Sequence, residues 1–419
     1  MRAEVDYSYE QPIVVIEVPK RREIIATSSG KMLRRIIRSY SGESYLLELD
    51  DQELLNALRL TITSEGQRVP TLAGLVLLGK ADRIAQLVPT AESGIQVLDG
   101  TAVQLNESGV YPLLSVLEQA EGILRTWNRF VELEDGLFQI KIPNIAPRAF
   151  REAIVNAYCH RDYTKLGRVR ISFEDAGVII SNPGGFIEGI TLSNLLEAEP
   201  HGRNPVLADA LKRIGLAEQS GRGIDRIFEG FLQYGSTLPD YSQSTNTLVR
   251  VVLPRIVPDK AFVSMVVQEQ SKQGRSLSVK ALLVLNALRN IQRATVEEIS
   301  NIANLPDVFT KVQLEQLLSL GLVETRGSGI HKEYMLDAKV YRSTGEAIQY
   351  VRYADIDETR YEELVVTLTK QQSKITRTDV AELLHISKSQ AYRIISKLKD
   401  SGQLEKVGSS KYTYYQLAE

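Results

Sequence analysis

Glu152 and Asn156, four positions apart, are a pair of residues that could act chemically on a charged ligand. On a helix, residues at this spacing share one face and lie one turn from each other. The residues between them are apolar and can pack into a core. The pair then presents a carboxylate and an amide oxygen, which suit a water molecule and a hard cation such as Mg²⁺. We therefore predict a helix over residues 147–159, with Pro147 in its first turn.

Two glycine-bearing turns follow this predicted helix. The first contains Asn182, Gly184 and Gly185, and the second contains Gly221 and Gly223. Each turn alone is common, because Pro and Gly favour turns. A glutamate and an asparagine four residues apart on a helix usually lie on a solvated face. In this order, however, the three segments predict a nucleotide site.

The order of these segments resembles the GHKL ATP-binding family of gyrase, MutL and the histidine kinases. In that family the first helix supplies a glutamate that activates water and an asparagine that binds Mg²⁺, and Glu152 and Asn156 match those positions. The resemblance implies an adenine loop at 182–185 and a turn at 221–223 that closes on the phosphates. Gyrase-type enzymes have Asp where this chain has Asn182, whose amide oxygen can still accept a hydrogen bond from adenine.

The residues are more similar still to one branch, the Schlafen/AlbA-associated prokaryotic regulators, which are often described as RecG-related ATP-binding proteins. The signatures at 160–163, 203–205 and 221–224 carry this resemblance, which covers about residues 10–255. The resemblance implies an ATP site. In such a site we expect His160 and Arg161, just past the helix, to contact or support the phosphates, and Arg203, in the loop before helix 206–214, to contact them.

Hydrolysis in such a site requires Glu152 as a general base, but an intact glutamate does not establish hydrolysis. Three hypotheses follow from the motifs. The protein is a regulator that binds ATP, or an ATPase that acts in nucleic-acid processing or defence, or it keeps a degenerate pocket as a structural or dimerisation domain.

Residues 74–81 have the spacing of a Walker A phosphate loop. That loop exposes backbone N–H groups and ends in Ser or Thr, whereas four large aliphatic residues fill this segment and Ala81 ends it. We interpret the segment as a buried strand, and we expect no Walker-type helicase motor.

The composition is that of a soluble globular protein with several domains. The 419 residues are enough for two to four domains, and no apolar run reaches the length of a transmembrane helix. The start has no apolar signal segment, and the single cysteine, Cys159, excludes an intramolecular disulfide and is expected to be buried. The four histidines show no metal-ligand spacing. We expect a cytoplasmic protein without membrane partners.

Basic residues gather between Lys20 and Arg38, although the net charge is only −2. This segment is either a phosphate-contacting patch or a solvated arm or loop. The strand-like run at 13–19 before it resembles the closing half of an AlbA-type module. The first half of such a module would precede Met1, so the chain is either a natural short form or truncated at its start.

The remaining pattern up to Pro258 alternates between helices and strands. We expect helices at 50–60, 113–131 and 206–214, a polar connection before the second of these, and strands at 168–174, 177–181 and 248–253. Such alternation predicts an α+β sandwich with helices on one face of a mixed sheet.

Beyond Pro258 the pattern changes to a helix–turn–helix that occurs twice. Helices at 280–290, 296–303 and 308–320 precede strands near 321–324 and 334–336, with a capping box from Thr295 to Glu298. The second copy has helices at 379–384 and 388–399 and strands at 402–407 and 412–417. Both have the order of a winged helix, a module that also serves in protein–protein contacts.

The second copy is the better DNA binder. Its predicted recognition helix leaves polar and basic residues facing outward, as a major-groove reader requires, and its lysines can meet phosphates. The first copy shows only Lys311 as an outward cation, so we expect a spacer or a dimerisation unit. The predicted DNA-contacting residues are Lys388, Ser389, Gln390, Arg393, Lys397 and Lys411.

Together these features predict an α+β protein with a GHKL-like α/β sandwich, preceded by a partial AlbA-like module and followed by two winged helix-turn-helix domains. We expect a homodimeric DNA-binding regulator in which ATP and Mg²⁺ binding is coupled to DNA binding. The predicted boundaries are 1–48, 49–257 (core about 145–255), 258–345 and 346–419.

Overall fold

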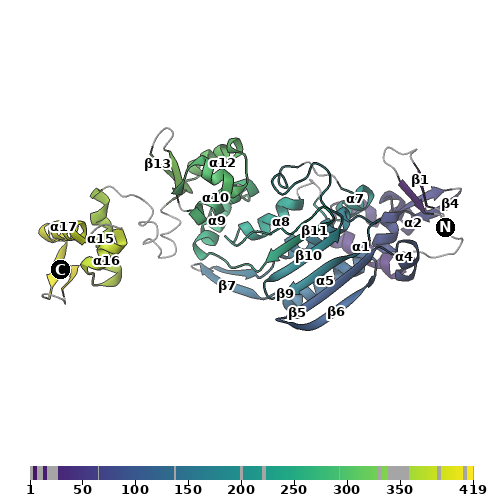
Figure 1. The fold of residues 1–419 in the computed structure, drawn as a ribbon, viewed down its shortest axis with the longest axis horizontal. Coiled ribbons are helices and arrows are strands. Elements are labelled where there is room, and N and C mark those ends of the chain that lie inside the picture. The colour runs from purple at the N-terminus through teal and green to yellow at the C-terminus, as the bar shows by residue number, and fades with distance from the viewer. Residues whose placement is uncertain are drawn as a thin grey trace. The chain divides into compact units, whose positions relative to one another are not determined.

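The computed structural model describes two compact units, Met1–Asp259 and Lys260–Glu419 (Figure 1). None of the helices in the described ranges is long and apolar enough to cross a membrane. The described residues are 3–6, 13–16, 27–64, 66–135, 138–198, 202–218, 223–291, 293–327, 332–337, 358–384, 388–408 and 413–418.

A five-stranded sheet forms the centre of the first unit (Figure 1). Neighbouring strands are antiparallel except β5 and β9, which run parallel with Glu92 opposite Arg168. The sheet is therefore mixed, as the α+β prediction required. Across the sheet the order is β11 (Leu248–Pro254), β10 (Gly177–Pro183), β9 (Arg168–Glu174), β5 (Glu92–Asp99) and β6 (Ala102–Val110).

The predicted hairpin of β9 and β10 is confirmed. Glu174 pairs with Gly177 next to the turn, and Gly177 has a φ of 149°, which glycine adopts without strain. Along β9 the side chains of Val169, Ile171 and Phe173 are buried. This alternation gives the sheet one face that is covered by helices and one that is partly solvated.

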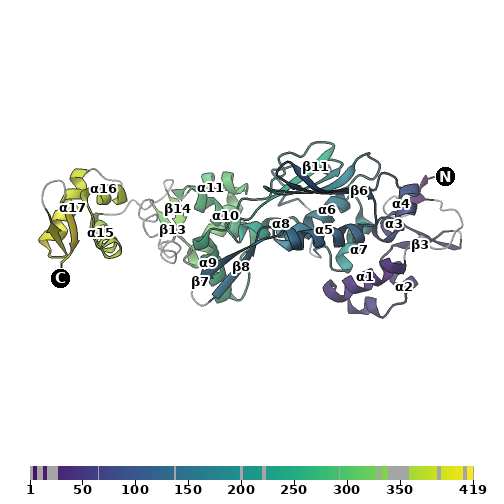
Figure 2. The same ribbon diagram turned by 90° about the horizontal axis from the view of Figure 1, so that it is seen from below.

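Helices α5 (Leu113–Trp127), α6 (Pro147–His160) and α8 (Gly223–Leu232) lie on one side of the sheet (Figure 2). Phe150 of α6 packs on Phe173 of β9 with ring centroids 5.6 Å apart. The predicted helix 113–131 ends earlier, at Trp127, because strand β7 (Phe130–Asp135) follows and pairs with β8 (Phe138–Pro143).

The segment predicted to be a buried strand around Leu75 is instead helix α3 (Leu72–Leu78), so that prediction was wrong. The Thr71 hydroxyl caps the helix by accepting a hydrogen bond from the Gly74 amide at 3.1 Å. Because this short helix is buried on every side, it lacks the apolar and polar alternation that distinguishes helix from strand in a sequence. Helix α4 (Ala81–Leu87) follows it.

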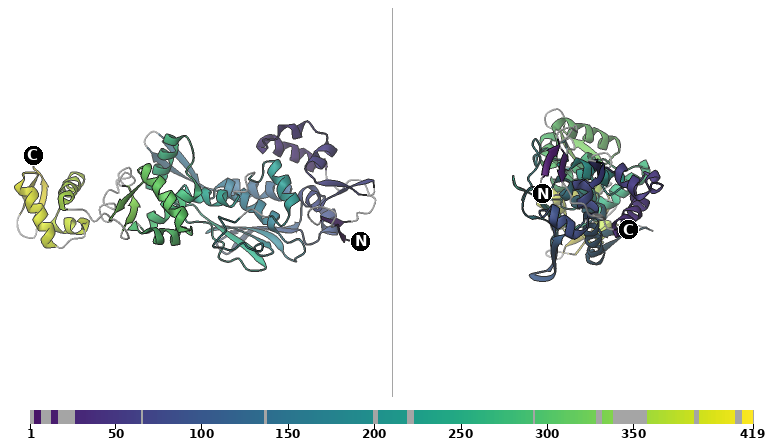
Figure 3. Two further views of the ribbon diagram at one scale, coloured as in Figure 1. Left: turned by 90° about the horizontal axis from the view of Figure 1, so that it is seen from above. Right: turned by 90° about the vertical axis from the view of Figure 1, so that its right-hand side faces the viewer.

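In the residues that the structure describes, the N-terminal part has two strand pairs and three helical segments, drawn in purple and blue in Figure 3. The Asp50 side chain forms the expected cap of α2 as part of a capping box with Glu53. The elements are β1 (Ala3–Asp6), β2 (Ile13–Ile16), α1 (Thr27–Tyr40), η1 (Ser44–Leu47), α2 (Asp51–Ala57), β3 (Thr61–Ser64) and β4 (Gln67–Pro70).

The basic segment predicted as a phosphate patch or a solvated arm is helical where it is described. Arg34 on α1 donates to Asp51 at 2.7 Å and to the Leu49 carbonyl at 2.8 Å, and Arg35 pairs with Glu118. These two arginines therefore tie α1 to its neighbours. Lys20, Arg21 and Arg22 lie outside the described residues.

The second unit contains two groups of helices, each followed by an antiparallel strand pair. The predicted capping box of Thr295 and Glu298 is confirmed, whereas the sequence analysis missed α9, α15 and the short strand β12. The first group is α9 (Lys260–Gln273), α10 (Val279–Ile291), β12 (Arg293–Ala294), α11 (Val296–Ala303), α12 (Asp307–Ser319), β13 (Val323–Arg326) and β14 (Glu333–Leu336). The second is α15 (Glu358–Gln372), α16 (Arg377–Leu384), α17 (Lys388–Asp400), β15 (Leu404–Val407) and β16 (Tyr414–Leu417).

Candidate functional site

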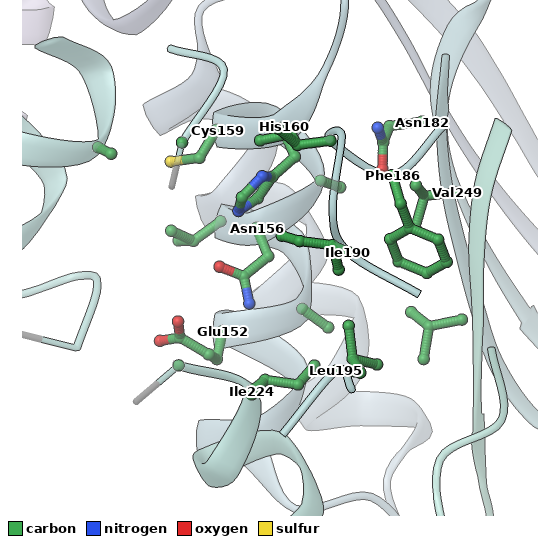
Figure 4. A pocket seen from close by; sticks show the side chains of 18 of the residues that line it. Glu152, Asn156, Cys159, His160, Asn182, Phe186, Ile190, Leu195, Ile224 and Val249 are labelled. Atoms are coloured by element: carbon green, nitrogen blue, oxygen red, sulfur yellow. The ribbon is translucent and has the colours of Figure 1, made fainter. Parts of the chain in front are cut away.

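A cavity of about 190 Å³ lies in the first unit between α6 and the strands β10 and β11. Glu152, Asn156 and His160 follow one another along the face of α6 that lines it (Figure 4). Their spacing of four residues gives this common face, as the sequence predicted. The structure thus brings the proposed catalytic and metal-binding side chains into one cavity.

The opposite wall of the cavity is apolar. It combines residues of β10 and β11 with a loop that follows β10, and Phe186 lies beside Val249 in Figure 4. A flat apolar slot of this kind suits an aromatic ring system such as a nucleobase. The apolar lining residues of this wall are Ile180, Phe186, Ile187, Ile190, Leu195, Val249 and Val251.

Glu152 is a buried carboxyl, with 7% of its surface exposed. Burial raises its pKa from 4.5 to about 7, and the nearby Glu218 carboxylate adds to the increase, while the Glu218 backbone amide, Arg226 and Lys212 act in the opposite direction. A carboxyl with a pKa near neutrality can both accept and return a proton. This is the property that a general base needs.

Asn156 and Lys212 are two polar groups of the cavity lining that are open to a ligand. Within the described residues neither side chain has a hydrogen-bond partner or an ion pair. Lys212 comes from α7 (Pro205–Arg213), which also contributes Ala208 to the lining one turn earlier. The Lys212 ammonium group can place a positive charge near Glu152, where phosphate is expected.

His160 and Cys159 are held in their neutral forms. Burial lowers the pKa of His160 to about 4, and the charge of Arg203 adds to this effect. Burial raises the pKa of the Cys159 thiol to about 12, which confirms its expected buried character and argues against a nucleophile. His160 therefore acts at neutral pH as an uncharged hydrogen-bonding group.

Gly223 begins α8 and lies directly against Glu152. A Cβ atom at this position would overlap the Glu152 Oε1 atom. Gly185 lines the cavity and leaves no room for a Cβ beside the backbone of Asn246. Gly184 has a φ of 97° and lies behind the cavity wall against Arg203. Gly221 lies outside the described residues.

Asn182, the residue predicted to hold adenine, lies on β10 and lines the cavity. It is 3% exposed, and its Nδ2 donates to the Pro183 carbonyl at 3.3 Å. In this orientation the amide oxygen is left to accept a hydrogen bond from a ligand. The position thus agrees with the predicted role.

Arg161 and Arg203 do not line this cavity. Arg161 is fully buried and donates to the backbone carbonyls of Thr90 and Gly167, and Arg203 donates to the carbonyls of His160 at 2.9 Å and Gly185 at 3.3 Å. These bonds support the surrounding backbone. Support was one of the two roles predicted for Arg161, whereas Arg203 was predicted only to contact phosphate.

Asn204 supplies a further support that the sequence analysis did not single out. Its side-chain amide donates to the carbonyls of Cys159 at 3.0 Å and Arg161 at 2.8 Å, at the end of α6. The 203–205 signature therefore holds the C-terminal end of the helix that carries the site. This satisfies carbonyls that a helix end leaves without partners.

The predicted DNA-contacting residues lie in the second unit, away from this cavity in the sequence. Lys388, Ser389, Gln390, Arg393 and Lys397 are all exposed on α17, whereas Ala391, Ile395 and Leu398 are buried. Lys397 forms an ion pair with Glu362 at 2.5 Å, so part of its charge is already balanced. Lys411 lies outside the described residues.

Two protein families match parts of the chain. Residues 167–253 match HATPase_c_4, described as "Putative ATP-dependent DNA helicase recG C-terminal", and residues 23–93 match DUF8451, a domain of unknown function. The first segment includes β9, β10, β11, α7 and α8, and the match suggests ATP binding. It begins after α6, so Glu152 and Asn156 lie outside it. No curated protein matches the chain.

Among solved structures, the DIP2311 protein from Corynebacterium diphtheriae is similar to this chain with a TM-score of 0.60. The two share 17% sequence identity, and the alignment covers 94% of this chain and 68% of that chain. At this level of identity the likeness concerns the fold alone. It agrees with a mixed α+β architecture.

Proposed function

We propose that this protein is an ATP-binding, DNA-binding regulator in which nucleotide state controls DNA binding. The observation that carries the proposal is the cavity of the first unit, whose lining combines Glu152 and Asn156 with an apolar wall and Asn182. The match of residues 167–253 to a HATPase family supports the nucleotide part.

The adenine ring would lie in the apolar slot, with its amino group donating to the Asn182 amide oxygen. The phosphates would then extend along α6 toward Asn156 and Glu152. Lys212 would neutralise part of their charge from the opposite helix. This orientation follows from the positions of the apolar and polar residues in the lining.

A magnesium ion fits the polar end of the cavity. Asn156 lines the cavity and has an amide oxygen without a partner in the described part of the chain. Mg²⁺ commonly takes one or two protein oxygens and completes its shell with phosphate oxygens and water. Bound there, it would shield the charge of the phosphates.

Hydrolysis is the second candidate function, and the raised pKa of Glu152 favours it. In such a step a water oxygen bonds to the terminal phosphorus while its proton passes to the Glu152 carboxylate. The bond from that phosphorus to the bridging oxygen breaks, and ADP keeps the electron pair. Loss of hydrolysis in Glu152→Ala would favour the nucleic-acid-processing ATPase over a regulator that only binds ATP.

We propose that the two helical groups of the second unit are winged helices. In the second group the exposed residues of α17 would enter the major groove, with Gln390 and Arg393 on base edges and Lys388 on phosphate. In the first group α12 exposes Val308, Phe309 and Val312, which supports the predicted dimerisation role better than DNA contact.

Calorimetry with ATP tests the nucleotide site. The unmodified protein should bind ATP more tightly with Mg²⁺ than without it, and Asn156→Ala should lose this Mg²⁺ dependence. Asn301→Ala, an exposed asparagine of α11, is the control and should behave as the unmodified protein. Absence of ATP binding by the unmodified protein would refute the nucleotide part and leave a structural domain.

A footprint on genomic DNA fragments tests the second part of the proposal. Arg393→Ala should weaken binding by about 1–3 kcal/mol and relax specificity at one base position. Lys370→Ala, an exposed lysine on α15, is the matched control. ATP should change the DNA affinity of the full chain, and an affinity independent of ATP would contradict the coupling.

A further inference from the structure

A second cavity, of about 280 Å³, continues the site past Glu152. The two cavities share Glu152, Ala217 and Glu218 in their linings. Unlike the apolar slot, the second cavity is lined mainly by charged and polar groups. Its other lining residues are Tyr40, Arg148, Arg151, Gly215, Leu216 and Arg226.

One stripe of residues on α6 connects the two cavities. Arg148, Glu152, Asn156 and His160 follow one another at intervals of four residues, so they share one face of the helix. Each interval advances about 6 Å along the helix axis. A ligand that reaches from the apolar slot past Asn156 to Glu152 therefore meets Arg148 next.

Three arginines line the second cavity, and two of them are already held in place. Arg151 donates from Nε to Glu121 at 2.6 Å, and its guanidinium lies over the Tyr40 ring at 4.4 Å. Arg226 donates from Nε to Glu218 at 3.2 Å and from Nη1 to Glu229 at 2.7 Å. Arg151 also donates from Nη2 to the Tyr40 hydroxyl at 3.3 Å, so its Nη1 atom and the Nη2 atom of Arg226 are left for a ligand.

Arg148 differs from these two arginines. It is exposed, and in the described part of the chain its guanidinium has no ion pair or hydrogen bond. The cavity lining contains three guanidinium groups and two carboxylates, of which Glu218 is paired with Arg226. An arginine without a partner beside two oriented arginines is an arrangement suited to an oxyanion with several acceptor oxygens.

We propose that this arginine-lined cavity binds inorganic phosphate, the product released when ATP is hydrolysed at Glu152. The claim that ATP hydrolysis supplies this phosphate rests on the proposed function. The claim that phosphate binds here rests on the cavity itself. Phosphate would leave the reaction site on the side of Glu152 away from the adenine slot. The nucleotide would then not have to dissociate before phosphate moves.

The test is a calorimetric titration of inorganic phosphate into the full chain without nucleotide, at fixed ionic strength. Arg148→Ala should weaken phosphate binding at least about tenfold, because one charge-assisted contact is lost. Arg129→Ala is the matched control, since Arg129 is equally exposed but lines neither cavity. Its affinity for phosphate should equal that of the unmodified protein.

Absence of phosphate binding by the unmodified protein, or equal binding by the unmodified protein and Arg148→Ala, would overturn the inference. Phosphate binding that depends on Arg148 in a protein that fails to bind ATP would refute the proposed function and retain the phosphate cavity. If the protein hydrolyses ATP, phosphate should inhibit as a product, and Arg148→Ala should raise the inhibition constant by the same factor as the dissociation constant.

Discussion

The carboxyl of Glu152 occupies a position in which its negative charge is unfavourable. Burial is the main reason that its pKa lies near 7, and the neighbouring Glu218 contributes to the effect. The folded protein therefore favours the protonated form of this group between the pKa of the unfolded chain, about 4.5, and about 7. The same property that suits a general base lowers the stability of the fold above neutral pH.

This leads to a prediction about stability and pH. The contribution of Glu152 is most favourable below pH 4.5 and is lost as pH rises through 7, because the unfolded chain releases the proton earlier than the folded chain. Glu152→Gln, which cannot ionise, should lose less stability between pH 5 and pH 8. The difference can reach about 2.5 kcal/mol, because just under 2 pKa units of the change fall between pH 5 and pH 8, at about 1.36 kcal/mol per unit.

Urea unfolding of both proteins at pH 5 and pH 8 measures this difference. Glu188→Gln, an exposed glutamate in the same unit, is the control and should follow the unmodified protein. Parallel loss of stability in Glu152→Gln and the unmodified protein would show that Glu152 is not protonated in the fold.

At the scale of single residues, spacing predicted the site well and roles less well. The interval between Glu152 and Asn156 was enough to place both in one cavity, because helix geometry fixes that relation. Arg203 was expected to contact phosphate and Arg161 to contact or support it, and both donate to backbone carbonyls. A sequence does not show which acceptor an arginine binds. Lys212 was not predicted as a site residue because no motif surrounds it.

At the scale of elements, the contact between α8 and α6 controls the site. Gly223 is the first residue of α8, and its lack of a side chain leaves room for the Glu152 carboxyl. Gly230, later on α8, packs closely against Ala146 and Ala149 at the start of α6. The two helices are therefore in close contact at two points. The contact at Gly230 holds α8 so that Gly223 stays against Glu152.

Gly223→Ala should displace the Glu152 side chain, because the new methyl group would overlap Oε1. We expect ATP hydrolysis, where it occurs, to fall at least about tenfold, while ATP binding through the apolar slot changes less, since a small misplacement of a catalytic group is costly. Steady-state kinetics and calorimetry separate the two effects. Gly42→Ala is the control, because a Cβ there meets no atom within 4 Å. Equal rates in both variants would contradict the argument.

Element prediction succeeded where local signals exist. The β9–β10 hairpin, helix α6 and the capping box of α11 were each predicted from turn and cap residues near their ends. Strands β5 and β6 were read as a polar connection, because β6 is exposed along most of its length and has no apolar alternation. Their place in the sheet depends on partners far away in the sequence, which no local pattern records.

At the scale of the whole molecule, all residues that line the two cavities belong to the unit Met1–Asp259. A fragment of residues 1–259 should therefore unfold cooperatively and bind ATP with Mg²⁺ within about threefold of the affinity of the full chain. Thermal unfolding and calorimetry test this expectation. A fragment that folds but binds ATP tenfold more weakly would show that residues after 259 contribute to the site.

The HATPase match covers three of the five strands of the central sheet, β9, β10 and β11. The strand that pairs with β9 on its other side, β5, lies outside the match, and so does α6 with Glu152 and Asn156. A fragment limited to residues 167–253 would expose the unpaired edge of β9, which favours aggregation. The folding unit is therefore larger than the matched segment.

The parallel pairing of β5 with β9 also has a consequence for how the chain folds. The β5–β6 and β9–β10 hairpins each join strands that are neighbours in the sequence, so each can form early and locally. No tight turn can join parallel strands, and here the chain passes through α5, β7, β8 and α6 before it returns. Joining the two hairpins therefore costs chain entropy, as does the addition of β11 to β10, and we expect these long-range pairings to limit the rate of refolding.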